Sequence, residues 1–433
     1  MNLIKIKSVT ESQMEKLLIP IIIVFLASCS NDDPIGNTPT VDPNANGLLW
    51  KEFIGTNEGG ARGFLKREKL VNIISLEEEA SDGKDIVLIV PLLPFYEDPN
   101  GVPFEPHDFE AYFDMHVADD GAAIEAAAFE LGSEIVKIEE AHGIEIFVQA
   151  GNEINGSAGG FEKYELICNP FGTTNQGKEC MIEPYVKYIL LPLAKGIKSA
   201  GAKMMTGSVI NTARIENRDF IDKILDFELD NGSYMSEYID YSSGHYMGAL
   251  SSGYDDLLAP VWSNRITGHI QTEEVGAKAA IENYGASQFL IVLARTLSYA
   301  IENDISAKEL RFCAWGSNLG SEGSTSLDMI EFLDDEILGD NRVELTTFEH
   351  SFSGEINAFT ANESKVFIAD ATNDLDTLKI VDPKCEIKHV EAYHIDTKGI
   401  NRLETEVNEN KVTLDQAIFL GESVLIKVVC QEP

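Results

Sequence analysis

Basic residues are scarce in this sequence of 433 residues. Lysine and arginine number 33 against 72 acidic residues, which gives a formal net charge of −39. A surface of that sign repels nucleic-acid phosphates, and no run of lysine or arginine offers a local exception. The composition therefore argues against nucleic acid as a partner and is typical of a solvated acidic surface.

Cysteine is also sparse, with six residues in the whole chain. No CxxC pair and no His/Cys cluster has the spacing of a zinc site. We therefore expect neither a metal nor another cofactor.

A long apolar run is missing near the N-terminus, where residues 17–26 are apolar but fall short of the roughly 20 residues that span a membrane. Lys5, Lys7 and Lys16 precede this run, and Ala27-Ser28-Cys29 follow it. A basic start, a short apolar core and small residues are typical of a secretory signal.

The residues after the apolar run resemble those of a bacterial lipoprotein. Leu26-Ala27-Ser28-Cys29 is similar to a lipobox, and Ser30-Asn31-Asp32-Asp33 after it is similar to the acidic export tract of Bacteroides-type surface lipoproteins. The resemblance implies a signal peptide over residues 1–29 and a lipid anchor on Cys29, which would attach the protein to the outer membrane at the cell surface. Residues 30–46 are rich in Pro, Asn, Asp, Gly and Thr, as in a flexible tether. An ordinary secretory signal with an incidental cysteine is the alternative.

Export places the remaining cysteines in an oxidising compartment, where they can pair. Cys168 and Cys180 bracket a loop rich in Gly, Asn and Thr, and Cys385 and Cys430 both lie in the C-terminal region. We expect these two pairs as candidate disulfides. Cys313 lies in an apolar strand and is expected as a buried thiol.

Strand-like and helix-like patterns alternate between residues 85 and 316, which is typical of parallel α/β architecture. Strands are expected at residues 86–93, 144–151, 203–208, 238–246, 267–273 and 310–315, and helices at 121–141, 185–200, 218–229 and 286–303. The candidates for two earlier strands, residues 48–53 and 70–75, are separated by a segment that contains Gly59-Gly60, which is poor for a helical crossover. We expect a TIM (β/α)8 barrel over residues 47–335 with an irregular or incomplete start.

The pattern changes after about residue 335 to short alternating runs separated by turn residues. Strands are expected at residues 365–369, 377–381, 390–395, 411–414 and 423–429. Residues 336–433 are therefore predicted to form a C-terminal β-sandwich.

The strand expected at 144–151 leads into Asn152-Glu153. Its even-numbered residues are aliphatic and should face the helices, so the odd-numbered ones should face the barrel interior: Phe147, Gln149, Gly151 and Glu153. Glu153 would then emerge at the carboxyl end of the strand, where barrel enzymes keep their chemistry.

This ending resembles the Asn-Glu ending of the fourth barrel strand in clan A glycoside hydrolases, a group of retaining (β/α)-barrel enzymes. The resemblance implies that Glu153 protonates the leaving glycosidic oxygen and that Asn152 bonds the 2-hydroxyl of the sugar. The alternative is an exposed loop glutamate.

Clan A also implies a second carboxylate at the end of the seventh strand. Thr272-Glu273 matches the Thr-Glu ending of the clan, while a Glu-x-Gly ending that is equally common matches the residues from Glu274 onward. We assign Ile270 and Thr272 to the helix-facing side, which leaves Glu273 facing inward. Glu273 is therefore the expected nucleophile and Glu274 the alternate.

Two further strand endings resemble sugar-binding positions of the clan. His245 and Tyr246 end the sixth strand, similar to a region where clan members place a tyrosine that bonds the nucleophile. Trp315 ends the eighth strand, where a tryptophan commonly forms a platform beneath the reactive sugar, because aromatic faces stack on sugar C–H surfaces. A structural tyrosine and a core tryptophan are the alternatives.

The function expected from these residues is a retaining glycoside hydrolase that cleaves a β-linked poly- or oligosaccharide. Glu153 would act as acid/base and Glu273 as nucleophile in a double displacement. The alternative is a non-catalytic surface lipoprotein that binds glycan on a degenerate barrel, since the first barrel units look incomplete.

Overall fold

The computed structural model describes residues 47–58, 73–90, 119–155, 182–209, 212, 215–245, 253–273, 285–315, 326–339, 341–346, 348–350, 355–370, 378–381, 385–396, 399–408, 410–414 and 422–431. The chain divides into two compact units, Met1–Asp42 and Pro43–Pro433, and every described residue belongs to the second. The predicted signal peptide, Cys29 and the tether lie outside the described residues. Within the described part, no helix combines the length and the apolar character that a membrane crossing requires.

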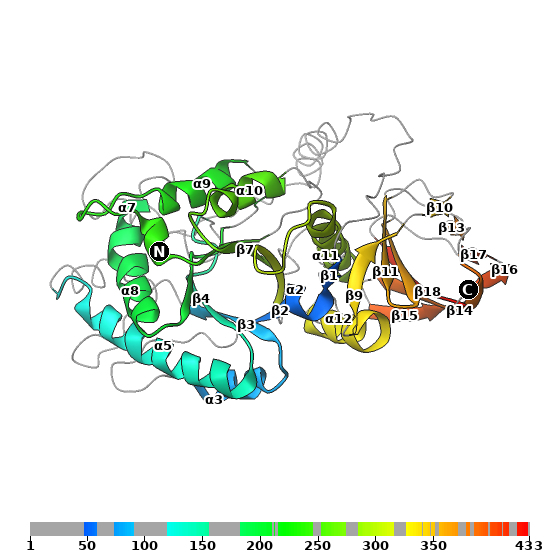
Figure 1. Cartoon of the computed structure of the whole chain (residues 1–433), viewed down its shortest axis with the longest axis horizontal. Helices are drawn as coiled ribbons and strands as arrows, with labels where there is room; N and C mark the ends of the chain where they lie inside the picture. Colours follow the sequence, from blue (N-terminus) through cyan, green and yellow to red (C-terminus); the bar gives the residue numbers. More distant parts are fainter. Residues whose placement is uncertain are drawn as a thin grey trace, which may run out of the picture. The chain divides into compact units, whose positions relative to one another are not determined.

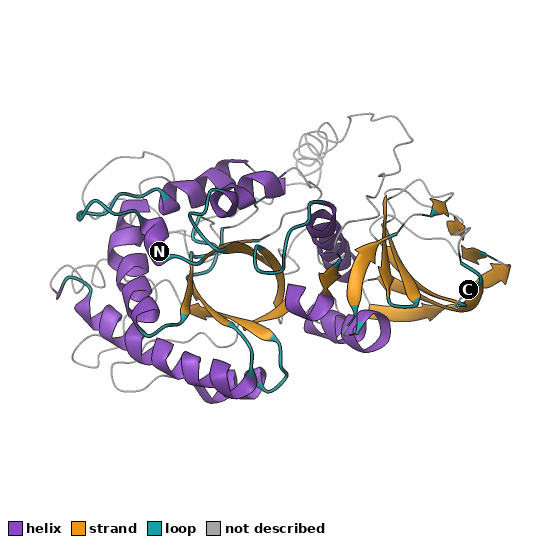
Figure 2. Cartoon of the chain, in the orientation of Figure 1, coloured by secondary structure: helices purple, strands orange, loops and turns teal. Residues whose placement is uncertain are grey.

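Seven parallel strands of the described residues close into a barrel, seen as the ring of strands in Figure 2. In order they are β2 (Ile54–Glu58), β3 (Asp85–Val90), β4 (Ile146–Ala150), β5 (Lys203–Met205), β6 (Tyr241–Gly244), β7 (Gly268–Glu273) and β8 (Leu310–Trp315). β2 pairs in parallel with both β3 and β8, which closes the ring. The six strands expected between residues 86 and 315 are present as β3 to β8.

Helices lie outside the ring of strands (Figure 1). They are α2 (Trp50–Phe53), α3 (Ile73–Ala80), α5 (Ala122–His142), α7 (Ile182–Tyr185), α8 (Leu191–Ser199), α9 (Ile215–Leu225), α10 (Gly253–Trp262), α11 (Gly285–Glu302) and α12 (Ser326–Phe332), with π-helical segments η4 (Val186–Leu190) and η6 (Leu333–Leu338) and a 3-10 turn η5 (Met235–Tyr238). The helix expected at residues 121–141 is present as α5, and Gly143 ends it with a φ of 71° that favours glycine. α5 and α8 approach closely at Gly196, where a Cβ would lie 2.3 Å from the carbonyl oxygen of Glu125.

The start of the barrel differs from the expectation. Leu48–Leu49 form β1, which pairs with β9 (Arg342–Leu345) in the C-terminal sheet, and the next four residues form α2. Residues 73–75, expected to be strand, begin α3, where Leu76 and Ala80 are buried at helical spacing. Neither segment therefore supplies a barrel strand in the described residues: Leu48–Leu49 are strand but pair with β9, residues 73–75 are helix, and residues 70–72 lie outside the described part. In the described residues β2 alone fills the place between β8 and β3.

The barrel interior is a packed core. Seven buried side chains fill it: Val87, Ile89, Phe147, Met205, Tyr241, Ile270 and Cys313. At the amino-terminal end, Arg311 pairs with Asp85 and Glu145, and its guanidinium lies 5.0 Å from the centre of the Phe147 ring. The interior of this barrel is therefore filled by side chains, as it is in TIM-type barrels.

The C-terminal region forms two antiparallel sheets. The larger has the order β1-β9-β11-β12-β18-β14-β15 and the smaller β10-β13-β17-β16. Their strands are β10 (Glu349–His350), β11 (Glu355–Ala361), β12 (Ser364–Asp370), β13 (Leu378–Val381), β14 (Ile387–Asp396), β15 (Gly399–Leu403), β16 (Glu406–Asn408), β17 (Lys411–Leu414) and β18 (Ser423–Cys430). Ile380 and Val412 of the smaller sheet share one buried cluster with Phe367 and Ile426 of the larger. The five strands expected here are present, in two sheets that share a core.

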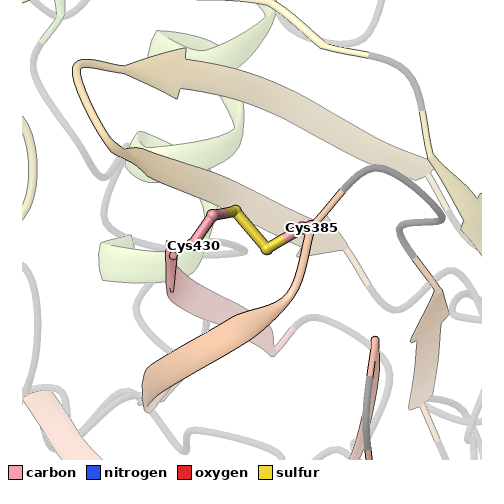
Figure 3. Close-up of a disulfide and its surroundings, with 2 residues drawn as sticks. All are labelled: Cys385 and Cys430. Atoms are coloured by element: carbon pink, nitrogen blue, oxygen red, sulfur yellow. A yellow bond between two sulfur atoms is a disulfide. The ribbon is translucent and has the colours of Figure 1, made fainter. Parts of the chain in front are cut away.

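One disulfide joins Cys385, which lies just before β14, to Cys430 at the end of β18 (Figure 3). The Cα atoms are 5.2 Å apart, which suits a disulfide. This predicted pair is confirmed, and so is the buried free thiol of Cys313, whose pKa burial raises to about 12. Cys168 and Cys180 lie outside the described residues.

Candidate active site at the carboxyl end of the barrel

Glu153 lies in a tight turn at the carboxyl end of β4. Gly151 and Glu153 both have positive φ, 89° and 48°. Glycine adopts this left-handed region freely, whereas a glutamate does so at a cost of about 1–3 kcal/mol and only where the surroundings hold it there. The Glu153 residue is 4% exposed, so the strained turn places a buried carboxyl at the end of a barrel strand.

The interior-facing pattern predicted for β4 is confirmed. Phe147 belongs to the interior cluster, and the side chain of Gln149 bonds to residues of β6 and of the segment after β5. Ser243 donates to the Gln149 carbonyl oxygen over 3.0 Å, and its hydroxyl lies 3.2 Å from that of Thr272. A layer of polar side chains therefore crosses the barrel just beneath the turn that carries Glu153.

His245 follows β6 and lies beside Glu153. Its Nδ1 is 3.5 Å from Glu153 Oε1, and the imidazole is fully buried. Thr212 holds the backbone here, because both its N–H and its hydroxyl donate to the carbonyl oxygen of His245. The structure thus brings three residues singled out from the sequence, Asn152, Glu153 and His245, to one place.

Tyr185 at the end of α7 fixes the same turn from the helix side, and sequence reasoning did not find it. Its hydroxyl donates to the carbonyl oxygen of Ala150 and accepts from the N–H of Gly207, each over 2.8 Å. Gly207 must be small, since a Cβ would lie 2.4 Å from that carbonyl oxygen. Burial raises the pKa of Tyr185, so the hydroxyl stays protonated and can donate.

The alternation along β7 is the reverse of the one expected. Ile270 lies in the interior cluster with Phe147, and Thr272 bonds to the interior Ser243. Glu273 pairs with Ala314, which faces the helices in the larger core. The premise that placed Ile270 and Thr272 toward the helices was therefore wrong, and alternation no longer favours Glu273 over Glu274.

Polar residues can face the helices on β7 because they satisfy one another. His269 Nδ1 is 2.8 Å from the Ser242 hydroxyl on β6, and its Nε2 is 3.3 Å from Gln271 Oε1. All three residues are fully buried. Burial lowers the pKa of His269 to about 4, against the opposing effect of its bond to Gln271, so the ring is neutral at pH 7.

The other predicted site residues are only partly described. Glu273 is the last residue of β7 and Trp315 the last of β8, at the same carboxyl end as Glu153. The side chains of both lie outside the described part, as do Glu274 and Tyr246 altogether. β4 and β7 are the third and sixth strands of the described ring, three places apart as the fourth and seventh would be.

Neither a metal-binding cluster nor a surface depression provides a second candidate active site among the described residues. Among them, no three or more His, Cys, Asp or Glu side chains are gathered as a metal would require. An open depression of about 700 Å³ includes Asp240, Thr267 and Glu309, which precede β6, β7 and β8. It therefore lies at the amino-terminal end of the barrel, opposite to the end where barrel enzymes keep their chemistry.

No family model and no curated protein matches the sequence. Solved structures resemble the fold. A GH30 endoxylanase from Clostridium papyrosolvens aligns over 90% of this chain and 99% of its own, with 11% identity and a TM-score of 0.44. A glucosidase from Croceicoccus marinus aligns over 85% and 84%, with 12% identity and a TM-score of 0.45. A family 51 α-L-arabinofuranosidase from Bifidobacterium longum aligns over 90% and 97%, with 10% identity and a TM-score of 0.40.

Proposed function

We propose that the protein is a retaining glycoside hydrolase that cleaves a β-linked poly- or oligosaccharide, with Glu153 as its acid/base. The observation that supports this most is the turn after β4, which holds a buried glutamate in a left-handed conformation at the carboxyl end of a barrel strand. A structural glutamate gains nothing from such strain, whereas an acid/base group must be held at one position relative to the scissile bond.

Glu153 acts twice in this mechanism. Its carboxyl proton goes to the glycosidic oxygen as the nucleophile carboxylate bonds to the anomeric carbon and the glycosidic bond breaks. The resulting Glu153 carboxylate later takes a proton from the water whose oxygen bonds to the anomeric carbon and displaces the nucleophile. His245 lies next to the group whose charge changes, because its Nδ1 is 3.5 Å from Glu153 Oε1.

Asn152 is oriented to bind the sugar. Its Oδ1 accepts a hydrogen bond from the Ser208 hydroxyl over 3.0 Å. With the oxygen fixed there, its NH2 group is directed away as a donor, which suits a sugar hydroxyl at the reacting ring. This is the role that the Asn-Glu ending implies.

The nucleophile in this proposal is Glu274 rather than Glu273. Ile270 and Thr272 face the barrel interior, and Glu274 shares their alternation in the sequence. A retaining mechanism needs the attacking carboxylate about 5–5.5 Å from the acid/base, so the nucleophile must face the barrel mouth. The Glu-x-Gly ending that begins at Glu274 agrees with this choice.

The cell surface is the proposed location. Cys29 would carry the lipid anchor in the outer membrane, and residues 30–46 would tether the barrel to it. Such an anchor places the site where soluble and particulate glycans arrive from outside.

The test compares Glu153→Gln with Glu145→Gln in the full chain. Glu145 directly precedes the same strand but lies at its amino-terminal end, which makes it a matched control. Because general acid catalysis contributes about 10²–10⁴-fold, Glu153→Gln should lower glycan turnover at least 100-fold, and Glu145→Gln less than about threefold. A mechanism-based fluoroglycoside should label Glu274.

Three outcomes contradict the proposal in different ways. Full turnover by Glu153→Gln would remove Glu153 as the acid/base. Labelling of Glu273 would reverse the choice of nucleophile. Glycan binding without turnover by the wild-type protein would favour the alternative, a glycan-binding lipoprotein on a seven-stranded barrel.

A further inference from the structure

Ser208 lies after β5, opposite the turn that carries Glu153, and is fully buried. Its hydroxyl takes part in three hydrogen bonds. It donates to Asn152 Oδ1 over 3.0 Å and accepts from the Glu153 N–H over 3.0 Å and from Gln149 Nε2 over 3.2 Å. A serine hydroxyl has one proton and two lone pairs, so its capacity is fully used.

The backbone of Ser208 binds the same turn. Its N–H donates to the Gly151 carbonyl oxygen over 3.3 Å, and its carbonyl oxygen accepts from the Ile154 N–H over 2.9 Å. The regular pairing of β4 with β5 stops at Gln149 and Met205. Beyond that point Ser208 takes over, and each residue from 151 to 154 bonds to it.

Which group donates and which accepts is determined for each of these hydrogen bonds. Gln149 and the Glu153 amide both donate to the Ser208 oxygen, so the hydroxyl proton is left to point at Asn152. Gln149 is itself oriented, since its oxygen accepts from Ser243 while its NH2 group also donates to the Gly151 carbonyl oxygen over 3.0 Å. One hydroxyl therefore sets both the backbone at Glu153 and the rotamer of Asn152.

We propose that Ser208 is a positioning residue for the acid/base, an inference that rests on the proposed function. Its hydroxyl holds the left-handed turn so that the Glu153 carboxyl meets the leaving oxygen, and it turns the Asn152 amide toward the sugar. Without it, the Glu153 amide loses its acceptor and the Asn152 side chain loses the donor that orients it. A displacement of about 1 Å at an acid/base is enough to cost on the order of 100-fold in rate.

Ser242→Ala is the matched control for Ser208→Ala. Ser242 is also fully buried in the barrel wall and hydrogen-bonded, but its partner is His269 on the helix-facing side. Each substitution removes one buried hydroxyl and leaves its partners to be satisfied otherwise. Ser208→Ala removes three hydrogen bonds and Ser242→Ala one, so the Tm of each variant is measured beside its kinetics. An effect on Glu153 should belong to Ser208→Ala alone.

The kinetic test uses the leaving group of the substrate as the readout. Phenyl and 2,4-dinitrophenyl β-glycosides of glucose, xylose and cellobiose are compared by kcat/KM, which reports the step in which the glycosidic bond breaks. A dinitrophenolate leaves without help from an acid, whereas a phenolate needs the proton of Glu153. Ser208→Ala should lower kcat/KM at least about 10-fold more for the phenyl glycoside than for the dinitrophenyl one, whose smaller fall reflects the lost orientation of Asn152. Ser242→Ala should stay within about twofold on both.

A second measurement does not depend on activity. Amide hydrogen exchange should accelerate at Glu153 in Ser208→Ala, because its N–H loses the hydroxyl acceptor, and stay unchanged there in Ser242→Ala.

Unchanged exchange at Glu153, or an equal fall in kcat/KM on both glycosides, would overturn the role of Ser208 and leave the proposed function standing. Faster exchange together with no turnover by the wild-type protein would overturn the proposed function instead, and with it any positioning role in catalysis. Faster exchange with the selective loss on the phenyl glycoside supports both.

Discussion

Arg311→Met tests whether a charge cluster holds the amino-terminal end of the barrel interior. Arg311 is 5% exposed and pairs with Asp85 and Glu145. Burial raises the pKa of Asp85 even though the guanidinium acts to lower it, which shows how unfavourable that position is for a charge. Glu145 is better placed, because its side chain is 35% exposed and Lys203 lies 3.5 Å from it.

The loss of stability expected for Arg311→Met follows from this difference between Asp85 and Glu145. After the substitution Asp85 is the carboxylate left buried without its cation, which costs about 3 kcal/mol, the lower end of the range for a broken buried pair. The lost contact of the guanidinium with the Phe147 ring adds about 1 kcal/mol. We therefore expect a loss of about 4 kcal/mol and a fall in Tm of roughly 5–10 °C at pH 7.

Thermal unfolding of the full chain measures the effect, with Arg265→Met as the control. Arg265 also binds two carboxylates, Asp222 and Asp226, but on the surface, so its loss should cost at most about 1 kcal/mol and less in high salt. Adding Asp85→Asn to Arg311→Met should restore part of the Tm, since the amide keeps an oxygen to accept from the Glu145 N–H. An Arg311→Met variant no less stable than Arg265→Met, or no recovery with Asp85→Asn, would refute the reasoning.

Two further predictions concern other parts of the fold. The disulfide between Cys385 and Cys430 spans 45 residues, so replacing both by serine should destabilise the C-terminal sheets by about 2–4 kcal/mol in calorimetry; an unchanged transition would contradict this. Because burial lowers the pKa of His269 to about 4, the unfolded chain binds its proton more readily, and stability should fall as pH drops from about 6.5 toward 4. His269→Gln should make that decline in Tm shallower, and parallel pH profiles for the two proteins would count against it.

Local patterns were sufficient for strands β3 to β8 and for the longer helices of the barrel. Aliphatic alternation in β4 predicted that Glu153 ends an inward-facing series, and the structure agrees because Ile146 and Val148 pack against helices. The helix over α5 was equally readable, since the spacing of its apolar residues acts within a few turns. Such signals act between residues that are close in the chain, so they do not depend on the rest of the fold.

The faces of β7 were predicted wrongly because a polar side chain does not have to face the barrel interior. His269 faces the helices in a neutral form, satisfied by Ser242 from the neighbouring strand, while Ile270 fills the barrel interior. A partner on another strand cannot be read from the alternation of one strand. The choice between Glu273 and Glu274 changed for this reason.

The sequence by itself predicted strands β3 to β8 and helices α5, α8, α9 and α11 of the barrel wall, the Asn152-Glu153 ending and the candidate pair of Cys385 with Cys430. Only the tertiary structure decided that β2 closes the ring and that Ser208 and Tyr185 hold the turn at Glu153. The physical reason is that both depend on hydrogen bonds between segments distant in the chain, which are chosen when strands meet in register rather than by any one segment.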